Sequence, residues 1–262
     1  QLVVVDKHPL YFSTQFGKTL SEKHGYLLLA VQHHKAHAAA VLAENKVVHT
    51  SSAVLCVVWD GTGLGDDKNI WGGEFFVYQN KELHRRFHFG YFPVLLGDKM
   101  AKEPRLSALC LCHELGEATH ILRTKFTEAE WSLYQKLLTK EGSLQCSSAG
   151  RIFDAVASLL CLSDKQSYEG EAALLLETAA QNYFTVNGYG FSETYRLDEM
   201  KAGKISTAGL FAGMLTDIKN GRPADFIAAK FHYSLVQLVK EVTKQLNLQQ
   251  IAFSGGVFQN AV

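Results

Sequence analysis

The chain has 262 residues, 26 basic and 26 acidic side chains, and 47% hydrophobic residues. This length can bury a sizeable core, as one large domain or as two lobes. A zero net charge without a long basic run gives no electrostatic footprint for nucleic acid, and no apolar run approaches the roughly 20 residues that span a bilayer. We therefore expect neither nucleic acid nor a membrane as a partner.

The cysteine pattern and the N-terminal segment predict a cytoplasmic protein. Five cysteines, at positions 56, 110, 112, 146 and 161, form no even disulfide framework and have no zinc-finger spacing. We interpret them as small apolar core residues in a reducing compartment. The first residues, QLVVVDKHPLYF, contain neither a basic leader nor a small-residue cleavage site.

The first third of the chain alternates β-rich runs with helical patterns. LVVVD, a helical stretch over 13–24, YLLLAVQ and a helix through His37 form a βαβα series, which favours a largely parallel sheet. The apolar run from Val54 to Trp59 predicts a buried strand that ends on Asp60. IWGGEFFVY and LHRRFHFGYF, joined near residues 79–81, predict an antiparallel hairpin that extends this sheet and makes it mixed.

The remainder is mainly helical. Apolar side chains recur at three- and four-residue spacing through residues 104–186, and again from residue 223 to 246, just before the strand QIAFS. We predict a metal-binding α/β lobe over 1–103, and a helical insertion with a nucleotide-binding lobe over 104–262. Both ends read as interrupted elements, so we expect a piece of a larger enzyme.

A candidate metal site combines two histidines with an aspartate. In VQHHKAHAAAVLAE, His33 and His37 lie four residues apart and project from one helix face. Asp60, delivered by the buried strand, could share one ion with them. The spacing alone is weak evidence, because an ordinary helix with polar residues facing solvent would also show it.

Two glycine-rich loops are candidate phosphate cradles. Residues 61–67, GTGLGDD, follow the strand that ends at Asp60 and could leave the amides of Thr62 and Gly63 free for a phosphate or carbonyl oxygen. A tight hairpin would explain the same residues. The strand QIAFS ends in Gly255 and Gly256, where a following helix could add the positive end of its dipole.

Two further acidic positions allow a structural and a functional interpretation. Asp154, in SSAGRIFDAVASLL, has apolar neighbours, so its carboxylate would be costly without a partner. Arg151 could pair with an acid structurally and is not assigned to the site. A charge-rich patch contains Asp98, Lys102, Glu103 and Arg105, and is either a solvated helix start or a substrate contact.

Motif order identifies a resemblance to the HypF carbamoyltransferase family, which matures NiFe hydrogenases. The motifs, in order, are VQHHKAHAAAVLAE, WDGTGLGDDKNIWGGEF, SSAGRIFDAVASLL, YEGEAA and FSGGVFQN. DKHPLYFST (6–14) and GDKMAKEPRLSAL (97–109) are also similar to family segments. The resemblance implies an α/β fold of the actin-like ATPase superfamily (ASKHA, RNase H-like), with mixed sheets and a helical insertion or second lobe.

The resemblance also implies a reaction and partners. In this family carbamoyl phosphate and ATP give carbamoyl adenylate, whose carbamoyl group passes to the C-terminal cysteine thiol of the acceptor HypE. The cofactors would be ATP or AMP and a divalent metal, zinc or iron, possibly with magnesium. Two alternatives remain: an O-carbamoyltransferase acting on a small hydroxylated substrate, and a non-catalytic nucleotide-binding actin-like scaffold.

Carried over residue by residue, the resemblance assigns roles in the site. His33, His37 and Asp60 would be the metal ligands and catalytic residues, and a further aspartate of the family would lie beyond Val262. The nucleotide would contact the Asp154 carboxylate through its ribose, with Gly170 permitting close approach. The remaining predicted nucleotide contacts are Gly61, Thr62, Gly63, Gly255, Gly256 and Asn260.

Overall fold

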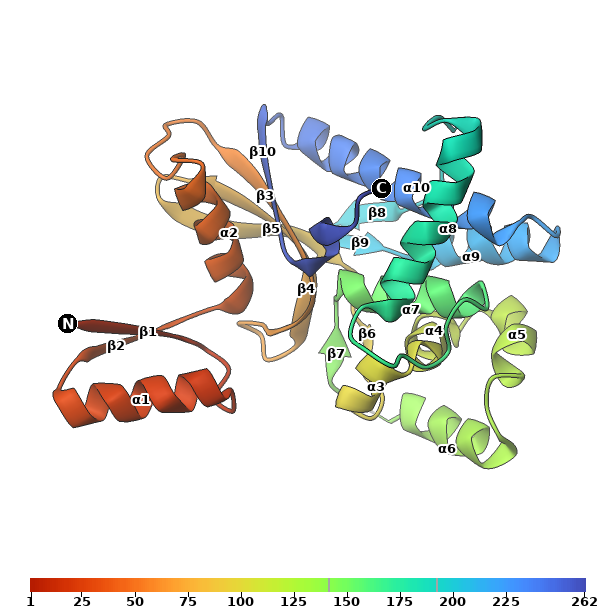
Figure 1. The fold of residues 1–262 in the computed structure, drawn as a ribbon, viewed down its shortest axis with the longest axis horizontal. Coiled ribbons are helices and arrows are strands. Elements are labelled where there is room, and N and C mark those ends of the chain that lie inside the picture. Colours follow the sequence, from red (N-terminus) through yellow and green to blue (C-terminus); the bar gives the residue numbers. More distant parts are fainter. Residues whose placement is uncertain (141, 192) are drawn as a thin grey trace.

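The N-terminal unit is a small βαβ element beside the main body. The structure, a computed structural model, describes residues 1–140, 142–191 and 193–262. Strands β1 (Leu2–Asp6) and β2 (Leu27–Val31) pair in parallel, and α1 (Phe12–His24) connects them. Figure 1 shows this unit standing to one side, joined to the rest through α2 (His33–Glu44).

A second, mixed sheet forms the centre of the molecule. Its strand order is β10 (Gln250–Ser254), β3 (Val54–Leu64), β4 (Ile70–Gln79), β5 (Glu82–Phe89), β9 (Lys204–Ser206) and β8 (Asp198–Lys201). Strand β10 is parallel to β3, whereas β3, β4 and β5 are successively antiparallel. The short strands β6 (Phe92–Pro93) and β7 (Gln145–Cys146) pair with each other, and β7 also pairs with β4.

The predicted hairpin is confirmed, but the expectation that it extends the sheet of the first two strands is wrong. β1 and β2 form a two-stranded sheet of their own. The place beside β3 is taken by β10, from the far end of the chain, and α2 packs across both strands. This pairing joins segments almost 200 residues apart, so no local sequence pattern signals it.

The apolar run in β3 is buried because both faces of the strand are covered. Leu55, Val57 and Trp59 enter a large core with the helices that follow β7. The alternate residues from Val54 to Val58 enter a smaller core under α2. Burial on both sides explains why this strand reads as a continuous apolar run rather than an alternating one. The expectation that the strand ends on Asp60 is wrong, because β3 continues through Asp60 to Leu64 after a register shift between Trp59 and Gly63.

The predicted helices are present. Their bounds are α3 (Asp98–Lys102), α4 (Pro104–Cys112), η1 (Gly116–Ala118), α5 (Thr119–Arg123), α6 (Glu128–Leu138), α7 (Ala149–Leu159), α8 (Glu171–Asn187), α9 (Ala208–Lys219), α10 (Ala224–Gln245) and η2 (Gly256–Gln259). Helix α4 packs on α7, and α10 packs on α8. The sequence interpretation had not assigned α9, β8 or β9. None of these helices, within the described ranges, is long and apolar enough to cross a membrane.

The predicted division after residue 103 stays a prediction. The central sheet contains strands from both sides of that boundary, since β9 pairs with β5 and β7 pairs with β4. The fold is therefore mixed α/β, with one sheet shared by the two predicted parts.

Candidate metal and nucleotide site

Two histidines of α2 converge on Asp60, inside strand β3. The side chain of Gln32 caps the helix by accepting from the Lys35 amide, which places both rings in the first two turns. The Nε2 atoms of His33 and His37 lie 3.2 and 3.4 Å from Asp60 Oδ2. One ligand atom from each of the three residues lies within 4.8 Å of the other two. The structure thus brings the three predicted ligands together.

Mutual hydrogen bonding sets the charges of this cluster. Burial raises the pKa of Asp60, but hydrogen bonds with His33 and His37 and from the Gly61 amide outweigh burial, so the pKa lies well below its ordinary value of 3.8. The hydrogen bond to Asp60 is also the main reason why the pKa of His33 is raised. A carboxylate held ionised between two imidazoles suits a divalent cation, which would replace the ring protons.

Asp6 orients His33, and the sequence interpretation missed it. Its Oδ2 lies 2.9 Å from His33 Nδ1, so the opposite ring nitrogen points toward Asp60. Its Oδ1 accepts from the His8 amide at 2.7 Å, which fixes the carboxylate at the end of β1. A carboxylate that binds the far nitrogen of a ligating histidine is the usual support of a metal ligand. An aspartate closing the apolar run LVVVD was the available signal.

Gly63 allows the backbone of β3 to lie against the rings of His33 and His34, because it has no side chain. A Cβ on Gly63 would lie 2.5 Å from His34 Cε1 and 2.8 Å from His33 Cδ2. His34 itself is fully buried, and burial lowers its pKa to about 4, so the ring is neutral. Its Nδ1 lies 3.1 Å from the Gln32 side-chain amide. His34 is therefore a core residue, and Gly63 has a steric role whether or not it contacts a nucleotide.

A cleft of about 560 Å³ opens beside the metal cluster. Predicted site residues form part of its lining: Asp60, Gly61, Asp154, Gly170, Gly256 and Asn260. Thr62, Gly63 and Gly255 are not among the described residues that line it. The cleft therefore lies between residues 60 and 61 of β3 and the N-terminal turns of α7 and α8.

Asp154 is a buried acid in the wall of this cleft. Its side chain is 3% exposed, and burial raises its pKa to about 6, against the opposing effect of Arg151. The guanidinium Nη2 of Arg151 lies 3.1 Å from Asp154 Oδ2. A carboxylate kept in such a place without a full set of hydrogen bonds is costly for stability.

Glycines of both predicted cradles approach Asp60 closely. Residues 61–64 are not the predicted loop, because they continue strand β3. The amides of Gly61 and Gly256 lie 2.9 and 3.3 Å from Asp60 Oδ1 and donate to it. Gly255 has a φ of 101°, and a Cβ there would lie 2.1 Å from the Trp59 carbonyl oxygen. The expectation that this loop starts a helix is wrong, because a short 3₁₀ turn, η2, follows it.

Asn260 is held by its surroundings at the other side of the cleft. Its Nδ2 lies 3.0 Å from His232 Nε2, and its Oδ1 accepts from the Val262 amide. Burial lowers the pKa of His232 to about 4, so this ring is neutral. Its Nδ1 lies 2.8 Å from the Ala228 carbonyl oxygen and therefore carries the ring proton, which leaves Nε2 to accept from the Asn260 amide. Within the described residues, Asn260 Nδ2 has this one partner, which leaves its second proton for a ligand.

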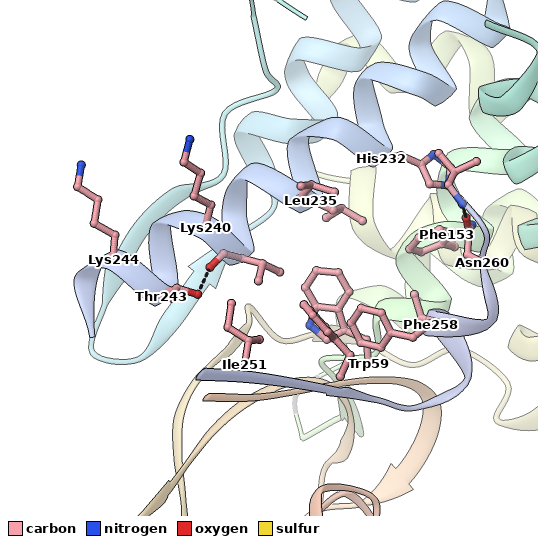
Figure 2. A pocket seen from close by; sticks show the side chains of 15 residues that line it. Trp59, Phe153, His232, Leu235, Lys240, Thr243, Lys244, Ile251, Phe258 and Asn260 are labelled. Carbon is pink, nitrogen blue, oxygen red and sulfur yellow. Dashed lines mark hydrogen bonds between the residues drawn. The ribbon is translucent and has the colours of Figure 1, made fainter. Parts of the chain in front are cut away.

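A second pocket, also about 560 Å³, lies between α10 and β10. Figure 2 shows Trp59 and Phe258 at its floor, and Lys240 and Lys244 at its outer edge. The two rings stack with centroids 5.4 Å apart. The described lining of this pocket is mostly apolar, and its ionisable groups are His232, Lys240 and Lys244.

The charge-rich patch before α4 is structural at its arginine. Arg105 is 5% exposed and donates to the carboxylates of Glu103 and Glu130. It also donates to the Lys125 carbonyl oxygen. All three guanidinium nitrogens of Arg105 have partners, so substrate contact is not needed to explain it.

Two family models match the chain. The family described as "Carbamoyltransferase, Kae1-like Domain, second subdomain" matches residues 56–262, and the family described as "HypF Kae1-like domain" matches residues 1–44. A Kae1-like domain implies an ASKHA-type fold. The chain belongs to the HypF carbamoyltransferase family and is homologous to its enzymes.

Relatives of known name and structure support the assignment. The chain is 32% identical to carbamoyltransferase HypF of Synechocystis sp., covering 99% of this chain and 35% of that protein. It is also 32% identical to a carbamoyltransferase HypF homolog of Cupriavidus necator, covering 100% and 68%. A crystal structure of full-length HypF in a phosphate- and nucleotide-bound form matches with a TM-score of 0.84 and 29% identity, covering 99% and 33%. The chain thus spans about a third of the length of most of the relatives it matches.

Proposed function

We propose that this domain transfers the carbamoyl group of carbamoyl adenylate to the C-terminal cysteine thiol of a HypE-like acceptor protein. The adenylate would be made from carbamoyl phosphate and ATP. The observation that carries the proposal is the convergence of His33, His37 and Asp60 beside a cleft whose lining includes Asp60 and Asp154. Membership of the HypF family supplies the carbamoyl chemistry.

The residues of the metal cluster suit zinc or iron. Two imidazole nitrogens and one carboxylate oxygen are three protein ligands, which leaves a coordination position open for water or substrate, as in catalytic zinc sites. When bound, such a cation supplies Lewis-acid stabilisation of the charge that develops on the carbamoyl oxygen. Asp6 keeps His33 in the tautomer that presents Nε2 to the shared point.

The transfer step balances without a covalent intermediate on this domain. The acceptor's thiolate attacks the carbamoyl carbon, a carbon–sulfur bond forms, and the carbon–oxygen bond to phosphate breaks with AMP taking the electron pair. The thiol proton leaves to solvent. Four of the five cysteines are buried, and burial raises the pKa of the Cys56 and Cys146 thiols to about 12. These thiols are poor nucleophiles, which agrees with a sulfur supplied by the partner.

A transfer assay tests the proposal. Carbamoyl adenylate is supplied to the domain with a HypE-like acceptor, and the acceptor's C-terminal peptide is analysed by mass spectrometry. We expect one carbamoyl group per acceptor with the wild type, and loss of transfer in His33→Ala and His37→Ala. His84→Ala, on an exposed position of β5, is the matched control. Transfer at the wild-type rate in both cluster variants would refute the proposal.

The two alternatives predict different results in the same assay. An O-carbamoyltransferase would leave the acceptor protein unmodified and carbamoylate a small hydroxylated compound. A nucleotide-binding scaffold would transfer nothing, and its metal content by elemental analysis would be the same in His33→Ala and wild type. The proposed function requires lower metal content in His33→Ala.

A further inference from the structure

The cleft contains a buried cation whose donors are largely unused. Arg151 lies in the first turn of α7, and its side chain is 12% exposed. Among the described residues, its Nε and Nη1 are buried and have no hydrogen-bond partner. Guanidinium groups are rarely buried with free donors, so the charge of Arg151 is poorly compensated within the protein. Because Nε and Nη1 are closed off, an anion in the cleft would meet the exposed part of this side chain and supply the missing negative charge.

Among the residues that the structure describes, the one acid paired with this guanidinium does not satisfy it. Asp154, one helical turn further along α7, lies 3.1 Å from Nη2. This contact is an ion pair that lacks hydrogen-bond geometry. Asp154 Oδ2 is therefore buried without a hydrogen-bond donor. Both residues line the cleft, so a ligand there can reach the pair.

Arg151 lies in the part of the cleft near Gly61, next to Asp60. Its Nη2 lies 4.0 Å from where a Cβ on Gly61 would stand, and Gly150 packs directly against Gly61. The other charged groups among the described lining residues are the carboxylates of Asp60, Asp154, Glu169 and Glu177. Arg151 is thus the one cation that this lining offers to an anion, and it lies beside the positive end of α7.

We propose that Arg151 binds the 5′-phosphate of the adenine nucleotide and thereby fixes its orientation, with the phosphate toward Asp60 and the ribose toward Asp154. This inference rests on the proposed function, because it assumes that the cleft binds a nucleotide. The orientation places the phosphate, and hence the carbamoyl group attached to it, next to His33 and His37. The sugar and base extend toward Gly170 and Asn260.

Paired titrations with AMP and adenosine isolate the phosphate contact. By calorimetry we expect Arg151→Gln to weaken AMP binding by about 10- to 100-fold, the range for losing hydrogen bonds from a charged donor, while adenosine binding changes by less than about twofold. Arg151→Lys keeps the charge but not the planar fork, and we expect it to recover part of the AMP affinity. Arg123→Gln, at a surface ion pair with Glu128, is the matched control.

The outcomes separate this inference from the proposed function. Equal losses for AMP and adenosine, or no loss of AMP binding in Arg151→Gln, would overturn the role of Arg151 while leaving nucleotide binding intact. A wild-type protein that binds neither ligand would overturn the nucleotide site and this inference together. Thermal unfolding of each variant, compared with wild type, confirms that the titrated proteins are folded.

Discussion

Replacing Asp154 by asparagine is expected to stabilise the ligand-free protein. The asparagine is close in shape to a protonated aspartic acid, so it removes the charge without opening a cavity. Burial raises the pKa of Asp154 from 3.8 to about 6. At about 1.36 kcal/mol per pKa unit, ionised Asp154 costs the folded state about 3 kcal/mol at neutral pH.

The pH dependence follows from the direction of this shift. Because the folded-state pKa is raised, the folded protein binds the proton more tightly than the unfolded chain does. The contribution of Asp154 to the free energy of unfolding is therefore fully favourable below pH 3.8, and it is lost as the pH rises through about 6. The stability gain of Asp154→Asn over wild type should be near its maximum at pH 7.5 and roughly half as large at pH 5.

Urea unfolding at pH 5 and pH 7.5 measures this difference. Glu241→Gln, on an exposed position of α10, removes one negative charge from the surface and controls for net charge. A gain of equal size at both pH values would show that packing, not ionisation, is responsible. No gain at pH 7.5 would refute the argument that Asp154 is held charged at a cost. A stability cost retained in this cleft agrees with a functional role, and we expect the same variant to bind AMP more weakly.

Four further results are expected. Asp6→Asn should lower zinc affinity about 10- to 100-fold in a competition assay with a chromophoric chelator, as for other supporting carboxylates; unchanged affinity would remove Asp6 from the site. Zinc affinity should also fall as pH drops, beginning above ~6.5 because the pKa of His33 is raised, and a flat profile between pH 5.5 and 8 would contradict ligation by histidine. Gly63→Ala should displace the His33 ring and weaken zinc binding, checked by the same assay. Gly255→Ala should reduce the free energy of unfolding by about 1–3 kcal/mol, since its φ of 101° and the nearby Trp59 carbonyl both exclude a Cβ; wild-type urea stability would show that the loop adapts.

Local patterns predicted the elements that carry the cluster. The apolar run before Asp60 is buried on both faces, and such a run has few alternatives to a core strand. The four-residue spacing of His33 and His37 requires only that the segment be helical for the rings to share a face. These features depend on neighbours in sequence, so the sequence was sufficient.

Non-local contacts could not be predicted in the same way. Strand β10 pairs with β3, almost 200 residues away in the chain, and this pairing places the Gly256 amide within hydrogen-bond distance of Asp60. Asp6 reaches His33 from a separate sheet, and its role depends on how the N-terminal unit meets α2. Arg151 had an equally good structural interpretation, because a sequence does not show which nitrogens of a guanidinium remain without partners.

Asp60 connects the two halves of the candidate site because its oxygens have different partners. Oδ2 faces the histidines, while Oδ1 accepts from the amides of Gly61 and Gly256. A carboxylate with a 20% exposed side chain needs such donors to remain ionised. Glycines supply them here because, without a side chain, the backbone following Asp60 in β3 and the backbone following β10 can both come within hydrogen-bond distance of Oδ1. The glycine amides therefore stabilise the Asp60 carboxylate in the ligand-free protein. Because Gly61 and Gly256 also line the cleft, the position of the Asp60 carboxylate would, under the proposed function, fix the distance between a cation bound by the histidines and a phosphate bound by Arg151.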